Sequence, residues 1–308
     1  MCKTQEEIGE IDTYNFSDEL NLKGLFEKKI QESNTVLIVN NNDISKIISQ
    51  INTTANDIEF SPEITSCKPE KGFKTELIKF QNGDTYQGYL NENNEKDGYG
   101  IYAKKNGIIY KGLWKNDEIG DYGAFIFPNG NYYKGNLVNG EINGEGEMVL
   151  NNKLKYIGNF TNNIPNKRGK LYNFIDNTLY EGDLVNGKKE GKGVLKFNDG
   201  TVYEGDFIDD KYEGNGKLTF RNGNIYEGNF SNNSMNGKGK FIYSDGKEYN
   251  GDFNNGLKHG FGRLSWSSDK YYEGYWINNR QHGDGIFYLN GKILKCIFRF
   301  GKMIMKND

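Results

Sequence analysis

Residues 203–225 read YEGDFIDDKYEGNGKLTFRNGNI, and this stretch contains the pattern that predicts the fold. Tyr203, Gly205 and Phe207 alternate with other residues, so all three lie on one face of an expected strand. A second alternating run over 216–220 ends at an Asn-Gly pair. Two short alternating runs beside an Asn-Gly pair are typical of a β-hairpin. The stretch therefore predicts a hairpin whose apolar face carries a tyrosine, a glycine and an aromatic residue.

The same unit recurs through most of the chain. Tyr-x-Gly begins nine times, at intervals of 23 or 24 residues. The nine tyrosines are Tyr86, Tyr110, Tyr133, Tyr156, Tyr180, Tyr203, Tyr226, Tyr249 and Tyr272. The large apolar residues two positions after each glycine are Leu90, Trp114, Leu137, Phe160, Leu184, Phe207, Phe230, Phe253 and Trp276. A fixed period of this length is typical of repeat proteins, in which each unit buries its apolar face against its neighbours.

Each unit has a second anchor, Gly-x-Gly, whose second glycine is present in every copy. Asp121 and Lys167 replace the first glycine in the second and fourth copies. The fourth copy is also longer after Gly169, which predicts a β-bulge or a longer turn near residues 172–178. The polar stretch between the two runs of a unit, such as residues 185–190, indicates a wide loop at the other end of the hairpin.

Partial units flank the nine copies. Residues 73–85 are expected to form a half repeat, because Ile78 and Phe80 match the second run of a unit. Residues 292–304 are expected to form a terminal capping strand, with Cys296 at the glycine position. The expected organisation is an extension over 1–72, the half repeat over 73–85, nine repeats over 86–291, the capping strand over 292–304 and a tail over 305–308.

Stacked hairpins of this kind predict an all-β repeat fold. One hairpin is marginal alone, whereas burying a phenylalanine or leucine against the next unit contributes roughly 1.5–3 kcal/mol. We therefore expect an elongated, twisted, single-layer antiparallel sheet of about nine β-hairpins, with a small helical N-terminal extension.

The unit resembles the MORN (membrane occupation and recognition nexus) repeat, which reads approximately Y-E-G-x-F-x-x-G-x-x-x-G-x-G. Residues 203–216 carry this resemblance most clearly, and it extends over residues 86–291. The resemblance implies a curved single-layer sheet and a family that includes junctophilins, ciliary radial-spoke-head proteins, apicomplexan cytoskeletal scaffolds and part of some plant phosphatidylinositol phosphate kinases. Only 17 residues follow Gly291, so the catalytic functions of multidomain relatives are not expected here.

Composition narrows the function further. The formal net charge is −3, with 39 basic and 42 acidic residues interleaved, which argues against a nucleic-acid partner. Cys2, Cys67 and Cys296 are too far apart for a disulfide framework or a metal site. No apolar run is long enough to span a membrane, and the N-terminus lacks a signal-peptide pattern. We therefore expect a cytoplasmic protein with no metal or cofactor.

Catalysis is not expected. His259 and His282 both precede a Gly-x-Gly pair in separate copies, where a loop role is expected. No base, nucleophile and orienting group can be assembled from them, so we expect neither a catalytic residue nor a small-molecule substrate. Asp183, Asp206 and Asp252 have the opposite parity to the aromatic residues, which predicts a solvated face.

The aromatic stripe has two interpretations. Either the rings cover one another within the chain, or part of the stripe stays open as a groove for an apolar helix or peptide. The candidate groove residues are Tyr180, Tyr203, Phe207, Tyr226, Phe230, Tyr249, Phe253, Tyr272 and Trp276.

Residues 1–72 lack the repeat and contain two amphipathic patterns, the first over 22–30. The second has helical spacing and consists of Ile44, Ile47, Ile48 and Ile51. The segment is interpreted as a helical cap on the first hairpin, as a partner-binding helix, or as a disordered extension.

Together these features predict a non-enzymatic scaffold that links other proteins of a larger assembly, in the cytoskeleton or a cilium. The alternative is a peripheral membrane adaptor that binds anionic phospholipid or phosphoinositide. The interleaved acidic residues disfavour this alternative, because such a surface needs clustered Lys and Arg.

Overall fold

The computed structural model describes residues 58–74 and 77–307. Nearly all of these residues form antiparallel β-strands, and the described part of the chain contains only one helix, the short α2 (Pro62–Thr65). The predicted all-β repeat fold is therefore confirmed. The amphipathic patterns over 22–30 and at Ile44, Ile47, Ile48 and Ile51 lie outside the described residues.

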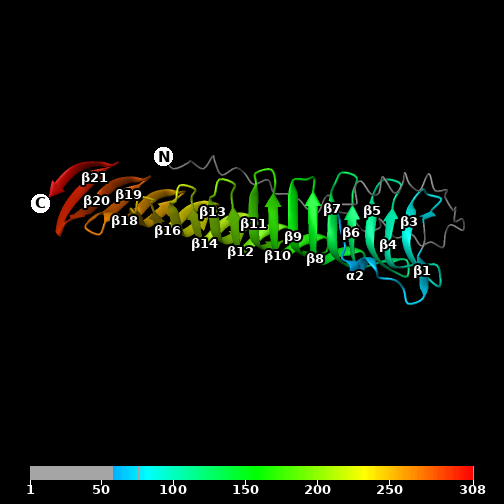
Figure 1. The fold of residues 1–308 in the computed structure, drawn as a ribbon. Helices are drawn as coiled ribbons and strands as arrows, with labels where there is room; N and C mark the ends of the chain where they lie inside the picture. The colour runs from blue at the N-terminus through cyan, green and yellow to red at the C-terminus, as the bar shows by residue number, and fades with distance from the viewer. Residues whose placement is uncertain (1–57, 75–76, 308) are drawn as a thin grey trace. The chain divides into compact units, whose positions relative to one another are not determined.

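The chain divides into two compact units, each an antiparallel sheet (Figure 1). The described residues of the N-terminal unit extend to Ile175, and its strands are β1 (Gly72–Lys74), β2 (Ile78–Lys79), β3 (Thr85–Asn91), β4 (Lys96–Ala103), β5 (Ile109–Lys115), β6 (Glu118–Ile126), β7 (Tyr132–Val138), β8 (Glu141–Leu150), β9 (Leu154–Thr161) and β10 (Ile164–Asn173). The described residues of the C-terminal unit begin at Asp176, and its strands are β11 (Thr178–Val185), β12 (Lys188–Lys196), β13 (Val202–Ile208), β14 (Lys211–Thr219), β15 (Ile225–Ser231), β16 (Ser234–Ile242), β17 (Glu248–Asn254), β18 (Leu257–Ser267), β19 (Lys270–Ile277), β20 (Arg280–Leu289), β21 (Lys292–Arg299) and β22 (Lys302–Asn307).

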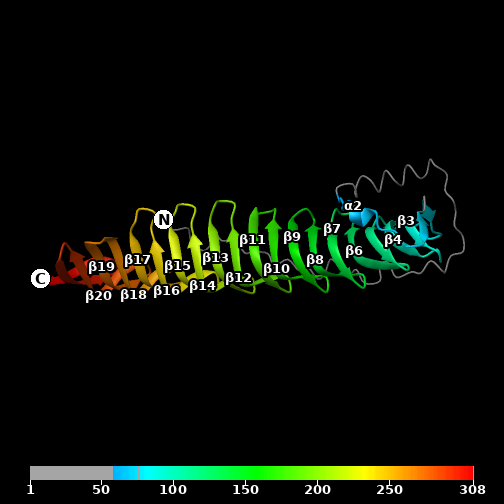
Figure 2. The same cartoon turned by 60° about the horizontal axis from the view of Figure 1, so that its bottom comes forward.

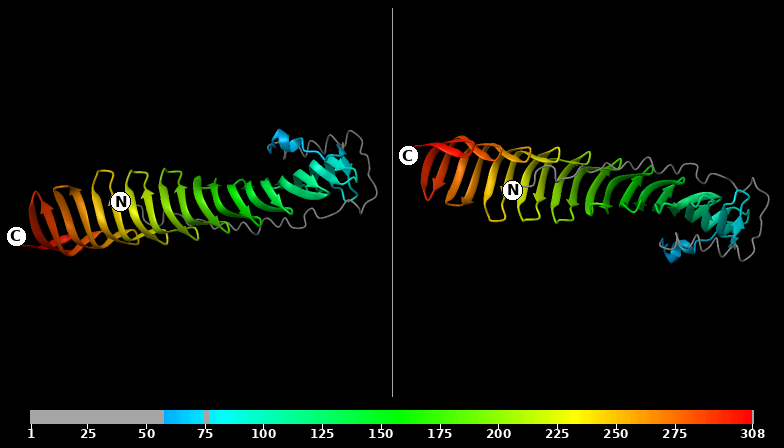
Figure 3. Two further views of the ribbon diagram at one scale, coloured as in Figure 1. Left: turned by 90° about the horizontal axis from the view of Figure 1, so that it is seen from below. Right: turned by 90° about the horizontal axis from the view of Figure 1, so that it is seen from above.

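Within each unit the strands pair in chain order. Successive strands pair from β3 to β10 in the N-terminal unit, while β1 and β2 both pair with β3. Successive strands also pair from β11 to β22 in the C-terminal unit. Figure 2 shows the turns of the C-terminal unit at alternate ends of its strands, and Figure 3 shows α2 beside the strands of the N-terminal unit. Each unit therefore presents two faces.

The alternation of burial along the strands follows the sequence pattern. In β13, Tyr203, Gly205 and Phe207 are buried, whereas Glu204 and Ile208 between and beyond them are exposed. We call the side that carries the repeat tyrosines the ring face, and the other side the opposite face. The predicted parity of the unit is therefore confirmed.

The turns differ from the sequence expectation. The wide loop expected over residues 185–190 is wrong, since β11 ends at Val185 and β12 begins at Lys188. Asn186 and Gly187 have φ angles of 51° and 79°, and two consecutive left-handed residues close a two-residue hairpin turn. The wider connection lies at the other end of the hairpin, where Gly223 donates a backbone hydrogen bond to Phe220 at 2.9 Å.

The two-residue turn of one hairpin is hydrogen-bonded to the start of the second strand of the preceding hairpin. The N–H of Lys189 donates to Asp210 Oδ1 at 2.9 Å, and the N–H of Asp210 donates back to the Lys189 carbonyl at 3.1 Å. The Lys189 ammonium also pairs with Asp210 at 3.1 Å, with both side chains largely buried. Lys96 and Asp117 form the same arrangement in the N-terminal unit. Burial lowers the pKa of Lys96, although Asp117 acts in the opposite direction.

Removing one partner of this buried pair is expected to be costly. We expect Asp210→Ala to lower the free energy of unfolding by about 3 kcal/mol, because it leaves the Lys189 ammonium buried without its counter-ion. Urea unfolding measures the change. The double variant Lys189→Met with Asp210→Asn is the control, since Met235 and Asn233 occupy the matching positions in later hairpins. Equal losses in the two variants would contradict this explanation.

The fourth repeat is the irregular one. A four-residue turn over 174–177 separates β10 from β11, within the region where the sequence predicts a β-bulge or a longer turn. Lys167 stands where other repeats have the first glycine of Gly-x-Gly, and its φ of 62° keeps the left-handed conformation of that glycine. A side chain in this region is strained by about 1 kcal/mol or more.

We expect Lys167→Gly to raise the free energy of unfolding by about 0.5–1 kcal/mol, because glycine adopts this φ without strain. Urea unfolding of the variant and of the native chain provides the measurement. The control is Lys170→Gly in the same strand. Lys170 does not have a positive φ, so a glycine at this position should destabilise the sheet. A loss of stability in Lys167→Gly would show that the glycine position is not strained.

The end of the C-terminal unit is a hairpin rather than a single capping strand over 292–304. Phe300 and Gly301 have φ angles of 47° and 85°, so they turn the chain back and β22 pairs with β21. Cys296 stands opposite Gly285, at the position that glycine occupies in the repeats. Leu294 replaces the repeat tyrosine at this end.

Candidate functional site

The nine candidate groove residues lie on the ring face of the C-terminal unit, and they are buried. Their exposed fractions range from 0% for Tyr203, Tyr226, Tyr249 and Tyr272 to 5% for Phe253. The interpretation of this stripe as an open groove is therefore wrong for these side chains, and the alternative of packing within the chain describes them.

The repeat tyrosine covers a pair of glycines. Gly205 and Gly216 face each other across β13 and β14. A β-carbon at position 205 would lie 2.6 Å from the Gly216 Cα and 2.6 Å from the Tyr203 hydroxyl oxygen. Since real side chains do not approach so closely, only glycine leaves room for the ring. The ring belongs to the same repeat as the glycine that it covers.

The tyrosine hydroxyl also satisfies a backbone group. After Gly205 the register of the ladder shifts, because β14 contains a bulge at Gly214 and Asn215. At this point Tyr203 Oη donates a hydrogen bond of 2.8 Å to the Asp206 carbonyl. All nine repeat tyrosines make the equivalent bond, at 2.7–3.3 Å. A buried carbonyl without such a donor would be destabilising.

Edge-to-face ring contacts connect successive repeats. Phe207 lies 5.1 Å from Tyr203 and 5.1 Å from Tyr180 of the preceding repeat, at near-perpendicular angles. Phe230 makes the same two contacts with Tyr226 and Tyr203. Such pairs contribute about 0.5–1.5 kcal/mol each beyond area burial. The ring face is thus occupied by its own rings, which leaves the opposite face for other contacts.

Cross-strand ion pairs occupy the opposite face in the middle of the C-terminal unit. Lys192 pairs with Asp206 at 2.5 Å, and Lys238 pairs with Asp252 at 2.6 Å. Both aspartates also accept a backbone N–H from the adjacent bulge, at 3.1 and 3.0 Å. The lysines are exposed, so these pairs contribute at most about 1 kcal/mol. The predicted position of these aspartates opposite the rings is confirmed.

In the N-terminal unit, the opposite face of β4–β7 is apolar and covered. A segment that precedes the repeats places Ile58 in a buried cluster on this face. The buried members of the cluster are Ile58, Ile109, Ala124 and Ile126, and the partly buried ones are Phe60, Ile101, Ala103 and Tyr132. The unit therefore holds a short peptide segment of its own chain against its opposite face.

An aromatic anchor and two lysines fix this segment. Phe60 packs edge-on between Tyr99 and Tyr122, with ring centroids 6.1 and 5.9 Å away. The ammonium groups of Lys111 and Lys134 lie 5.5 and 5.1 Å from the centre of the Phe60 ring. The two lysines also donate hydrogen bonds to the backbone carbonyls of the segment. Burial and the nearby Lys134 lower the pKa of Lys111.

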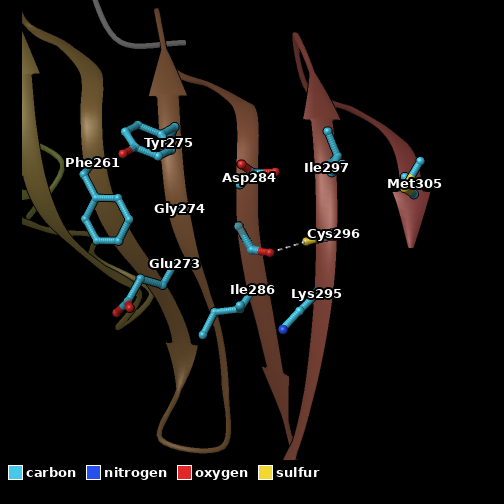
Figure 4. A pocket seen from close by; sticks show the side chains of 11 residues that line it. Phe261, Glu273, Gly274, Tyr275, Asp284, Ile286, Lys295, Cys296, Ile297 and Met305 are labelled. Carbon is cyan, nitrogen blue, oxygen red and sulfur yellow. Dashed lines mark hydrogen bonds between the residues drawn. The ribbon is translucent and has the colours of Figure 1, made fainter. Parts of the chain in front are cut away.

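The C-terminal unit has an apolar concavity of about 370 Å³ on its opposite face, across β18–β22 (Figure 4). The large apolar side chains that line it are Phe261, Tyr275, Ile286, Ile297 and Met305. Phe261, Tyr275 and Met305 are 45%, 53% and 50% exposed. Phe261 and Tyr275 form an edge-to-face pair at 5.4 Å. We call these five residues the terminal patch.

Charged groups border the terminal patch. Glu273, Asp284 and Lys295 also line the concavity, and Glu273 is paired with Arg263 at 2.6 Å. Cys296 is buried beneath the patch, where its thiol donates to the Gly285 carbonyl at 3.3 Å (Figure 4). Burial raises the pKa of this thiol, so it is held in the unreactive protonated form.

Sequence reasoning missed the terminal patch, although a signal was present. Middle repeats have Lys192, Asn215 and Lys238 between the two glycines of the second anchor, whereas Phe261 stands there in the eighth repeat. Tyr275 likewise replaces the Asp or Asn that precedes the final aromatic residue in the middle repeats. Apolar residues at solvated positions indicate a contact surface.

The two histidines lie in strands rather than in loops, because the preceding turns contain only two residues. His259 is in β18 and His282 is in β20. His282 Nδ1 accepts the backbone N–H of Phe300 at 3.4 Å, and its ring packs on Phe300 at 4.7 Å. Among the described residues, no three His, Cys, Asp or Glu side chains are placed to hold a metal ion.

The sequence model of the MORN repeat matches eight segments of the chain, which together exceed half its length. They are residues 86–108, 110–132, 133–154, 180–202, 203–225, 226–248, 249–270 and 272–291. The chain therefore belongs to the MORN repeat family. The fourth copy is not matched, yet Tyr156 covers Gly158 and Gly169 as in the other repeats.

Two solved structures align with this chain at low identity and low TM-score. The TCP10 domain of Danio rerio CPAP is 14% identical, covers 75% of this chain and 98% of its own, and has a TM-score of 0.35. The TCP domain of Drosophila melanogaster SAS-4, in complex with a proline-rich motif of Ana2, is 15% identical, covers 59% and 86%, and has a TM-score of 0.28. At these values neither likeness indicates a function for this chain.

No curated protein matches the chain in sequence. The only helix in the described residues is the four-residue α2, and none there is long and apolar enough to cross a membrane.

Proposed function

We propose that this chain is a non-enzymatic scaffold that binds segments of other proteins, within a cytoskeletal or ciliary assembly. The observation that carries the proposal is the exposed terminal patch on the opposite face of the C-terminal unit. An apolar surface of this kind, with Phe261 and Tyr275 at positions that are polar in the middle repeats, is typical of a protein-contact site.

The N-terminal unit supports the proposal by example. Its opposite face holds a short segment through one phenylalanine between two tyrosines, together with hydrogen bonds to the segment's backbone. The terminal patch offers a similar combination, since Phe261 and Tyr275 stand beside the charged Lys295 and Glu273. A partner segment with one large apolar side chain would fit such a surface.

A binding role also agrees with the distribution of reactive groups. His259 and His282 lie in separate hairpins, and Cys296 is buried with a raised pKa.

Detergent extraction of the native cell tests the assembly. We expect the native chain to remain with the insoluble cytoskeletal or axonemal fraction, and the double variant Phe261→Ser with Tyr275→Ser to be released. The matched control is Phe174→Ser with Ile175→Ser, which removes two exposed apolar side chains from a turn. Complete release of the native chain into the detergent fraction would overturn the proposal.

A further inference from the structure

Among the described residues, the last strand of the C-terminal unit is paired along one edge only. β22 pairs with β21 through residues 302–307, and no other described strand pairs with it. Its outer backbone N–H and C=O groups are thus available to a further strand. Natural edge strands are normally short, charged or covered, because an exposed apolar edge attracts other chains.

This edge is apolar. Met303, Ile304 and Met305 are consecutive exposed residues of β22, and Ile293 and Phe300 are exposed in β21 and in the turn before β22. Met305 stands opposite Ile297, so the edge continues directly into the terminal patch. A strand added to β22 would therefore bury apolar side chains as well as form backbone hydrogen bonds.

The same region is strongly basic. No acidic residue occurs between Asp284 and Asp308, whereas the basic residues in that interval are Lys292, Lys295, Arg299, Lys302 and Lys306. The side chains of Lys292, Lys295, Arg299 and Lys302 are exposed. None of these four forms an ion pair with a described residue, unlike Lys192 and Lys238 in the middle of the unit.

This charge selects the kind of partner. A second copy of the chain, paired edge to edge, would bring two unneutralised basic edges together, which is unfavourable. An acidic partner would instead neutralise Arg299 and Lys302, which stand opposite each other in β21 and β22. The formal net charge of −3 for the whole chain makes this basic region a local feature.

We infer that β22 binds an extended partner segment that alternates apolar and acidic residues and pairs with it as an additional strand. This inference rests on the proposed function, since it names the partner chemistry of the same scaffold. The apolar side chains of the segment lie on the ring face beside Met303, which stands opposite Phe298, and its carboxylates lie on the opposite face beside Lys302 and Arg299.

Binding of short synthetic peptides to the full chain, measured by fluorescence anisotropy, tests the inference. A peptide that alternates Glu and Val is expected to bind at least about tenfold more tightly than one that alternates Lys and Val, and more weakly as salt rises. Two further Glu–Val peptides carry N-methyl groups on alternate backbone amides. In one peptide the methylated register is that of the Glu amides, and in the other it is that of the Val amides. One of these peptides is expected to lose binding and the other to retain it, because a paired strand uses alternate N–H groups on each edge.

A charge-reversal variant separates this site from general charge effects. Arg299→Glu with Lys302→Glu is expected to invert the preference, so that the Lys–Val peptide binds better. The control is Lys196→Glu with Lys211→Glu, which changes the net charge equally on exposed positions of β12 and β14 and should leave the preference unchanged. An inverted preference cannot arise from unfolding, so a destabilised variant does not mimic the expected result.

Four outcomes would overturn the inference. They are equal binding of both N-methylated registers, equal effects of the two double variants, self-association of the native chain through β22 in sedimentation, and binding of anionic phospholipid vesicles without binding of the Glu–Val peptide. If the Glu–Val peptide binds but detergent releases the native chain completely from the cytoskeletal fraction, the inference about β22 is retained and the proposed cytoskeletal or ciliary assembly is overturned.

Discussion

Replacing Gly205 by valine is expected to lower the free energy of unfolding by about 3 kcal/mol or more. The new β-carbon would lie 2.6 Å from the Gly216 Cα and from the Tyr203 hydroxyl, so the ring must leave its position. Overpacking of this kind costs about 1–3 kcal/mol, and the displaced ring loses its bond to the Asp206 carbonyl, which is worth about 1 kcal/mol. The contacts of Tyr203 with Phe207 and Phe230 would weaken as well.

Thermal and urea unfolding measure this loss, and hydrogen exchange locates it. Protection should fall in β13–β15, because Tyr203 connects two hairpins through Phe230. The matched control is Glu204→Val, which adds the same side chain one residue earlier, on the exposed face of β13. A negligible shift in the unfolding temperature of Gly205→Val would show that the ring does not require the glycine.

Alkaline pH is expected to unfold the chain steeply. Burial raises the pKa of Tyr156 to about 12, and burial also raises the pKa of Tyr86, Tyr110, Tyr133, Tyr203, Tyr226, Tyr249 and Tyr272. In the unfolded chain these phenols ionise near pH 10. The stabilisation is therefore fully present below pH 10 and is lost as the pH rises toward the folded-state values.

The expected dependence on pH is large because the repeats act together. Each tyrosine that keeps its proton only in the folded state lowers stability by up to about 1.4 kcal/mol per pH unit above pH 10. The tyrosinate absorbance and the far-ultraviolet circular dichroism should change together in one transition. Gradual ionisation with an unchanged circular dichroism spectrum would show that the repeat tyrosines titrate within the folded sheet.

Sequence spacing was sufficient to predict the hairpin array. The period of the Tyr-x-Gly unit defined the strands, and its parity placed Tyr203 and Phe207 on one face and Asp206 on the other. It also located the irregular fourth copy, whose turn lies at residues 174–177. These features are local, since a strand alternates its side chains whatever packs against it.

The openness of the ring face could not be predicted from the same pattern. A row of aromatic residues has the same spacing whether it forms a groove or a core. The Tyr203 hydroxyl bond to Asp206 depends on a bulge in the neighbouring strand, and that bulge is a property of two strands together. Likewise, the position of His259 depended on a two-residue turn in place of the expected wide loop.

The sequence by itself determined the repeat, the strands and the side of each strand that is apolar, because the period fixes all three. Only the tertiary structure decided which apolar residues remain available to a partner. The repeat tyrosines fold over their own glycines and are buried, whereas Ile58 and Phe60 cover the opposite face of β4–β7. Phe261 and Tyr275 stay exposed in the C-terminal unit. Which surfaces are covered depends on contacts between residues far apart in the chain, and a repeat period contains no information about them.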